Sequence, residues 1–143
     1  GYTVNVPLPF KADDAIFIRA FDEIVTPIAS QYKPEFMLIS AGFDGHYSDP
    51  VGDLSLSMMG YKEAFGRIVG LAEKLCQGKL VVALEGGYSL NFLGKMVTSA
   101  IAKMAHASYR VNDSRPVGHP RVLRKAEQVI SNVKTIQSVY WRL

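Results

Sequence analysis

The stretch that decides the fold is Met37-Leu-Ile-Ser-Ala-Gly-Phe-Asp-Gly-His-Tyr-Ser-Asp-Pro50. Its first half is a short apolar run that follows Lys33-Pro34, which predicts a buried strand of a parallel sheet, apolar on both faces. Its second half is polar and places Asp44, His46 and Asp49 just past the carboxyl end of that strand. Ligands and catalytic groups gather at this end of open α/β sheets. Aspartates also cap ordinary turns, so the residues alone leave both interpretations open.

The segments on either side alternate between strand and helix patterns. Apolar and β-branched runs predict further strands at 2–8 and 79–84, and apolar residues at helical spacing predict a helix from Asp13 onward that Pro27 kinks or splits. Further helices are expected at about 57–76, 89–106 and 120–136, with an exposed connection at 111–120 and a tail that packs back. This alternation indicates an α/β fold with parallel strand pairing.

Composition is typical of one soluble domain spanning 1–143, with 48% hydrophobic and 20% charged residues. No apolar run approaches the roughly 20 residues that cross a bilayer, and no signal peptide opens the chain. The single cysteine, Cys76, favours a reducing, cytoplasmic setting. The net charge of +3 arises largely from a basic cluster near the C-terminus, which is expected to be a solvated face rather than a nucleic-acid site. That cluster comprises Arg110, Arg115, Arg121, Arg124 and Lys125.

Four segments together resemble the histone deacetylase family, most closely its class II members and their bacterial deacetylase and acetylpolyamine amidohydrolase relatives. They are Ser40-Ala-Gly-Phe-Asp-Gly-His-Tyr-Ser-Asp-Pro-Val-Gly52, Leu54-Ser-Leu-Ser-Met-Met-Gly-Tyr61, Leu84-Glu-Gly-Gly-Tyr-Ser-Leu90 and the opening Gly1-Tyr-Thr-Val-Asn-Val-Pro-Leu-Pro9. The resemblance covers most of the chain and corresponds to the C-terminal half of the family's domain. It implies a three-layer α/β/α arrangement with a parallel sheet, part of the arginase/deacetylase fold.

The resemblance also assigns roles at the ends of the two central strands. Asp49 matches one of three protein ligands of a catalytic zinc, and Tyr88 matches the tyrosine that stabilises the tetrahedral intermediate. Gly86 and Gly87 match the glycines beside the acyl-lysine channel, where a backbone without Cβ atoms can approach the substrate. From the residues alone, a carboxylate facing a phenol suits metal-assisted amide hydrolysis, and a turn aspartate beside a packed tyrosine is the alternative.

Other parts of the family's catalytic site have no counterpart in this sequence. The family's remaining zinc ligands lie on an earlier Asp-x-His motif and its general base on a His-His pair, whereas the only histidines here are His46, His106 and His119. Asp44-Gly45-His46 has the Asp-x-His pattern but lies in the loop of the third ligand. We therefore expect Asp44 to order the loop through hydrogen bonds to backbone amides, and His46 to have a surface or supporting role. Without the missing ligands and base, this chain alone is expected to be inactive and to bind zinc weakly.

Three functions stay open at this point. The first is the C-terminal part of a zinc-dependent deacetylase that acts on an acylated amine such as acetyl-lysine. The second is a non-enzymatic module that binds a partner or itself, because strands that lack their neighbours expose apolar edges; a homo-oligomer or a complementary half would cover them. The third is a nucleotide-binding domain, suggested only by Gly86-Gly87 before a helix and lacking the full glycine fingerprint.

Overall fold

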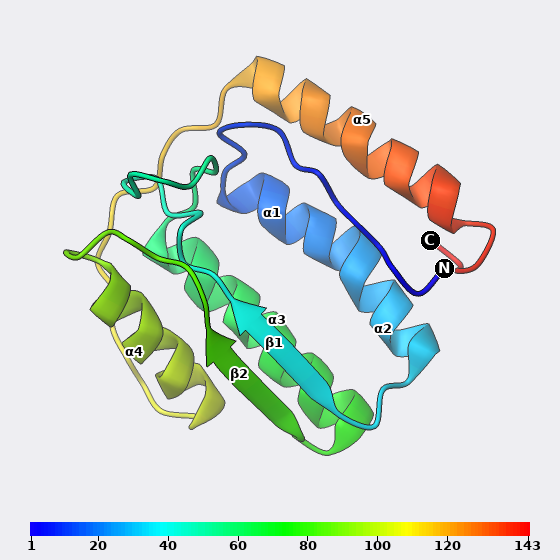
Figure 1. The fold of residues 1–143 in the computed structure, drawn as a ribbon, viewed down its shortest axis with the longest axis horizontal. Helices are drawn as coiled ribbons and strands as arrows, with labels where there is room; N and C mark the ends of the chain where they lie inside the picture. The colour runs from blue at the N-terminus through cyan, green and yellow to red at the C-terminus, as the bar shows by residue number, and fades with distance from the viewer.

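The computed structural model describes all residues, 1–143, as a small parallel sheet packed against helices, with a second helical layer beside it (Figure 1). The central part of the chain alternates helix and strand, as the sequence predicts for an α/β fold. The elements in order are α1 (Asp14–Ala20), η1 (Phe21–Val25), α2 (Thr26–Tyr32), β1 (Met37–Ala41), α3 (Met58–Cys76), β2 (Leu80–Leu84), α4 (Leu93–Met104) and α5 (Pro120–Gln137).

The sheet has two parallel strands, β1 and β2, in register from Met37 opposite Leu80 to Ala41 opposite Leu84. Helix α3 connects them, as parallel pairing requires a long crossover. One face of the sheet packs against α3 and α4 through an apolar cluster that includes Phe65, Met96 and Ala41. The two strands and the long helix predicted between them are therefore confirmed.

Local features of the chain mark the start of α1 and both ends of α3. The Ser57 hydroxyl accepts a hydrogen bond from the Gly60 N–H at 3.2 Å and caps α3. At the other end, Gln77 and Gly78 adopt left-handed conformations that stop the helix. Asp13 caps α1 in the same way by accepting from the Ile16 N–H at 3.0 Å.

The segment before β1 is one continuous helical stretch with a π-helical turn in its middle. That turn, η1, lies immediately before Pro27, which occupies the first turn of α2. Proline lacks an N–H and crowds the carbonyl four residues earlier, so the turn ahead of it widens to recover a hydrogen bond from the Thr26 N–H to the Phe21 carbonyl. The helix is therefore not split at Pro27, and the irregularity that accompanies this proline is a π turn.

The N-terminal segment differs from the prediction. Residues 2–8 are extended but pair with no strand, so the predicted strand is wrong. Instead Val4, Val6 and Leu8 pack between η1 and α5, around Ile24 and Ile130. The alternating apolar pattern that suggests a strand is here satisfied by two helices on either side of a single extended segment (Figure 1).

The C-terminal tail packs back onto the start of the chain, as predicted. The Trp141 indole N–H donates to the Gly1 carbonyl at 2.8 Å, and the Arg142 N–H donates to the Gln31 side chain at 2.9 Å. The two chain ends therefore lie side by side, at the end of the molecule away from the strand arrowheads (Figure 1).

The second face of the sheet is open. Leu38 is 75% exposed and Val81 is 49% exposed, and both point away from the face covered by α3 and α4. The prediction of strands buried on both faces therefore holds for one face only.

No helix of the chain is both long enough and apolar enough to span a bilayer.

Candidate active site

Two loops meet at the carboxyl ends of β1 and β2. Backbone hydrogen bonds continue past the paired strands, from the Glu85 N–H to the Ala41 carbonyl at 3.0 Å and from the Phe43 N–H to the Gly86 carbonyl at 2.8 Å. The β1–α3 loop and the β2–α4 loop consequently leave the sheet side by side, as expected for neighbouring parallel strands.

Asp49 joins these two loops through its carboxylate. One oxygen, Oδ1, accepts from the backbone N–H groups of Val51 at 3.0 Å and Gly52 at 3.3 Å. The other, Oδ2, accepts from the N–H groups of Tyr88 at 2.7 Å and Ser89 at 3.0 Å. Partial burial raises the pKa of this carboxyl, but the four backbone donors outweigh burial and lower the pKa. Asp49 is therefore ionised at neutral pH, and its acceptor positions are engaged by the protein's own backbone.

Tyr88 and the two glycines before it, Gly86 and Gly87, lie on the β2–α4 loop. Tyr88 is 52% exposed, and its backbone N–H donates to Asp49. Gly87 has a φ of +135°, and a Cβ there would lie 2.7 Å from Leu93. A Cβ on Gly86 would meet the Asp44 carboxylate at 3.0 Å. Both glycines thus have a packing reason within the chain, in addition to the substrate channel that the family resemblance implies.

Asp44 differs from the expectation that it orders its loop by accepting from backbone amides. Its carboxylate instead fills the space above two glycines, so that a Cβ on Gly42 would lie 2.7 Å from Asp44 Oδ1. The backbone carbonyl of Asp44 also lies where a side chain on Gly52 would project. Asp44 therefore shapes the loop by close packing against glycines.

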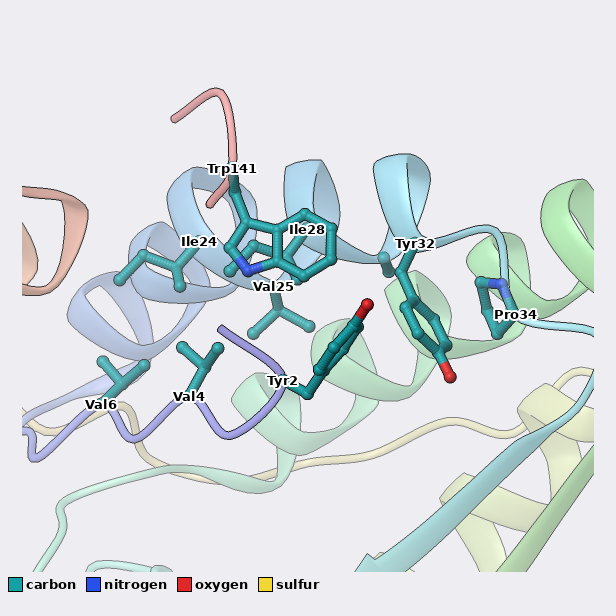
Figure 2. Close-up of a pocket in the computed structure, with 10 residues that line it drawn as sticks. Tyr2, Val4, Val6, Ile24, Val25, Ile28, Tyr32, Pro34 and Trp141 are labelled. Atoms are coloured by element: carbon teal, nitrogen blue, oxygen red, sulfur yellow. The ribbon is translucent and has the colours of Figure 1, made fainter. Parts of the chain in front are cut away.

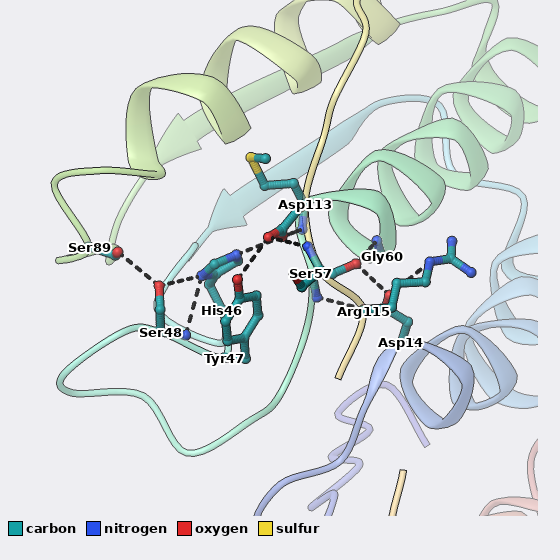
Figure 3. Close-up of polar contacts among 11 residues, drawn as sticks. Asp14, His46, Tyr47, Ser48, Ser57, Gly60, Ser89, Asp113 and Arg115 are labelled. Atoms are coloured by element: carbon teal, nitrogen blue, oxygen red, sulfur yellow. Dashed lines mark hydrogen bonds and ion pairs between the residues drawn. The ribbon is translucent and has the colours of Figure 1, made fainter. Parts of the chain in front are cut away.

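His46 lies in the interior, so a surface role is excluded and a supporting role remains. Its side chain is 0% exposed and both ring nitrogens have partners (Figure 3). Nδ1 lies 2.9 Å from the Ser48 Oγ, and Nε2 lies 3.0 Å from the Asp113 Oδ2. The ring also packs against Phe92, at the start of α4, with 4.7 Å between ring centroids. The imidazole therefore contacts three separate segments.

Sequence reasoning missed Asp113, which contacts His46 beside the candidate site. It lies in the predicted exposed connection, yet its side chain is only 1% exposed. The carboxylate accepts from His46, from the Tyr47 hydroxyl at 2.9 Å and from the Met58 N–H at 2.8 Å. Burial raises the pKa of Asp113, but the donors from Met58, His46 and Tyr47 together lower it. Nothing in the surrounding Asn-Asp-Ser run distinguishes this aspartate from a turn residue.

A second buried carboxylate supports the same region from α1. Asp14 accepts from the Ser57 N–H at 2.7 Å and the Ser57 hydroxyl at 2.6 Å (Figure 3). Arg115 from the 111–120 connection lies 3.6 Å from the same carboxylate. The start of α3 is thus anchored by Asp14 on one side and by Asp113 on the other.

The two remaining histidines lie outside this region. His106 follows α4, and its Nε2 lies 3.0 Å from the Glu73 Oε1, with its side chain 70% exposed. His119 caps α5, where its Nδ1 accepts from the Arg121 N–H at 3.1 Å. Neither reaches the loops of Asp49 and Tyr88.

The side chains present do not form a metal centre. No group of three or more His, Cys, Asp or Glu side chains is arranged to hold an ion. A catalytic zinc normally takes three protein ligands, and here Asp49 is a single carboxylate whose oxygens already accept four backbone hydrogen bonds. The residues of this chain therefore do not by themselves fit the zinc that the family resemblance implies.

A hollow of about 510 Å³ lies elsewhere, where the N-terminal segment, the helix before β1 and the C-terminal tail meet (Figure 2). Three rings line it, Tyr2, Tyr32 and Trp141, with centroids 6.0 to 6.5 Å apart. The rest of its lining is aliphatic. It holds none of the predicted site residues and lies at the opposite end of the molecule from the loops described above (Figure 1).

Comparison with known proteins agrees with this fold and loop arrangement. The histone deacetylase domain model matches residues 1–104. An Archaeoglobus fulgidus protein named "Probable deacetylase" is 38% identical over 158 residues, covering 99% of this chain and 42% of that protein. The Danio rerio protein named "Polyamine deacetylase HDAC10" is 32% identical over 99% of this chain and 20% of its own length.

Solved structures give the same result. The crystal structure of the HDA15 HD domain superposes with a TM-score of 0.78 at 33% identity, over 98% of this chain and 35% of that chain. The chain therefore spans less than half the length of each of these relatives. The family model, the sequence identity and the shared fold together establish that this chain belongs to the histone deacetylase family.

Proposed function

We propose that this chain supplies Asp49 and Tyr88 to a deacetylase site that hydrolyses acyl-amides. The observation that carries the proposal is the 2.7 Å hydrogen bond from the Tyr88 N–H to the Asp49 carboxylate, at the carboxyl ends of two parallel strands. It holds the backbone of Tyr88 beside the Asp49 carboxylate, so the loop that carries the phenol lies against the loop that carries the carboxylate. Family membership supports the reaction class.

Each residue has a distinct role in this proposal. The Tyr88 hydroxyl projects from an exposed ring and donates a hydrogen bond to the oxyanion as the amide carbonyl becomes tetrahedral. Asp49 corresponds by resemblance to one zinc ligand. The two other ligands and the general base have no counterpart among the side chains around Asp49, so they come from residues outside this chain. A positioned base contributes about a hundredfold to ten-thousandfold, so the chain alone is expected to be inactive.

The substrate class follows from the family names. One relative is named a polyamine deacetylase and others are named histone deacetylases. Both names describe removal of an acyl group from an amine, so we propose an acylated amine as substrate.

The buried, unpaired Cys76 is compatible with the reducing, cytoplasmic setting expected from the sequence.

The test is a chimera. Residues 1–143 replace the matching segment of the Archaeoglobus fulgidus relative. We expect the chimera to deacetylate an acetyl-lysine peptide or an acetylated polyamine, and Asp49→Asn or Tyr88→Phe to reduce the rate by about a hundredfold or more. Tyr32→Phe, which removes an exposed phenol at the opposite end of the molecule, is the matched control. Undiminished activity in Tyr88→Phe would contradict the proposal.

The exposed sheet face favours a second candidate, a module that associates with itself or with a complementary half. Leu38 and Val81 lie on this face, and both strands have an unpaired edge. We expect light scattering after size exclusion to give a mass above that of one chain, and Leu38→Glu with Val81→Glu to return it to a monomer. The exposed Ile101→Glu on α4 is the control. A wild-type monomer would exclude self-association.

A further inference from the structure

The buried histidine of the β1–α3 loop has no assigned role in the deacetylase family's reaction, yet it lies at the junction of the segments that form the candidate site. His46 belongs to one loop, packs against Phe92 of the second loop, and is bonded to Asp113 of the α4–α5 connection. Its carbonyl also accepts the Asp49 N–H at 2.8 Å. A single side chain therefore connects three segments beside the proposed metal ligand.

The donors and acceptors around His46 are consistent with one directional chain. The Ser48 N–H, which can only donate, lies 3.4 Å from Nδ1, so Nδ1 is the acceptor and the neutral ring carries its proton on Nε2. Nε2–H then donates to the Asp113 carboxylate. The Ser48 hydroxyl donates to Nδ1, which leaves its oxygen free to accept from the Ser89 hydroxyl at 3.1 Å. Every polar atom along this path has a partner.

This series of hydrogen bonds ends at Ser89, which is also bonded to Asp49. The Ser89 hydroxyl is joined to Ser48, and the Ser89 N–H donates to the Asp49 carboxylate at 3.0 Å. The Ser89 carbonyl accepts from the N–H groups of Phe92, which caps α4, and of Leu93, its first residue. Ser89 is therefore fixed on three sides, and Tyr88 immediately precedes it.

We propose that His46, Ser48, Ser89 and Asp113 form a brace that positions Tyr88 relative to Asp49. Asp113 anchors the ring, the ring orients Ser48, and Ser48 restrains the loop that carries Tyr88 (Figure 3). His46 is thus a positioning residue that acts through Ser48 and Ser89. The catalytic meaning of the brace rests on the proposed function, but its structural effect can be measured without any reaction.

The test measures hydrogen exchange of individual backbone amides by NMR. The Tyr88 and Ser89 N–H groups are the informative ones, because both donate to Asp49. His46→Asn keeps a polar atom near the position of Nδ1 but is too short to reach Asp113, and Ser48→Ala removes the link to Ser89. We expect each variant to accelerate exchange at these two amides about tenfold, the effect of one lost hydrogen bond on a local opening. Exchange in α5 should be unchanged.

A double variant tests whether the residues act as one unit. Because His46→Asn and Ser48→Ala interrupt the same path, the double variant should exchange at the single-variant rate. Thr98→Ala, which removes an exposed hydroxyl bond to the Gly94 carbonyl on α4, is the control and should have no effect at Tyr88. Should His46→Asn fail to fold, the exposed Ser48→Ala decides alone.

Two outcomes would overturn the brace. One is unchanged exchange at Tyr88 and Ser89 in the folded variants, and the other is additive acceleration in the double variant. Neither outcome depends on deacetylation. An inert chimera with a responsive loop would remove the proposed function and leave the brace, whereas an active chimera with an unresponsive loop would do the reverse.

Discussion

Replacing Asp113 by alanine is expected to cost a large share of the protein's stability. The substitution removes a carboxylate with a 1% exposed side chain that accepts from His46 and from the Met58 N–H. Both donors are buried, and each buried donor left without a partner costs about 1–3 kcal/mol. Two such donors give about 4 kcal/mol, out of a total of roughly 5–15 kcal/mol for a domain.

Urea denaturation followed by circular dichroism measures this loss. With a slope of about 2 kcal/mol per molar urea for a chain of this size, the midpoint should fall by about 2 M. Asp22→Ala is the matched control, because Asp22 pairs with Arg67 at 2.6 Å while its side chain is 48% exposed. Exposed pairs contribute about 0–1 kcal/mol, so its midpoint should move by less than about 0.5 M. A shift that small in Asp113→Ala would refute the reasoning that Asp113 is a buried anchor.

Two further predictions concern the pH dependence of stability and the effect of adding a Cβ at two glycines. The lowered pKa values of Asp113 and Asp49 mean that the unfolded chain, with carboxyl pKa values near 3.8, binds protons more readily than the folded one, so stability should fall as the pH drops below about 4. Urea midpoints between about pH 5 and pH 3 should decline less in Asp113→Asn than in the wild type, and parallel declines would contradict this. Gly87→Ala should destabilise by about 1–3 kcal/mol, because φ is +135° and the new Cβ meets Leu93. By contrast, Gly70→Ala, with nothing within 4 Å in the middle of α3, should stabilise by about 0.5–1 kcal/mol, and thermal melts that fail to separate the two would count against the packing account.

The main elements of the fold were predictable because their signals are local. Apolar runs ended by turn residues identify β1 and β2, and Ser57 with Gln77-Gly78 marks both ends of α3. Residues 2–8 show the limit of such patterns. Alternating apolar residues record that one side of an extended segment is buried, but not whether a strand or a pair of helices buries it.

The site was predictable only in part, for a physical reason. Asp49 and Tyr88 follow consecutive parallel strands, so their proximity follows from topology. The burial of His46 depends on Asp113, which lies 67 residues later in a connection with no regular structure. The Asp113 carboxylate is buried because donors from His46, Tyr47 and Met58 converge on it. No local sequence pattern encodes that convergence.

Zinc retention tests the central claim, that residues outside this chain complete the site, most directly. The measurement is the metal content after dialysis of the purified chain and of the chimera, both loaded with zinc. The account predicts about one zinc per chimera, lost in Asp49→Asn, and none retained by residues 1–143 alone. One zinc held by the isolated monomer and lost in Asp49→Asn would contradict the account, because the remaining ligands would then lie within this chain.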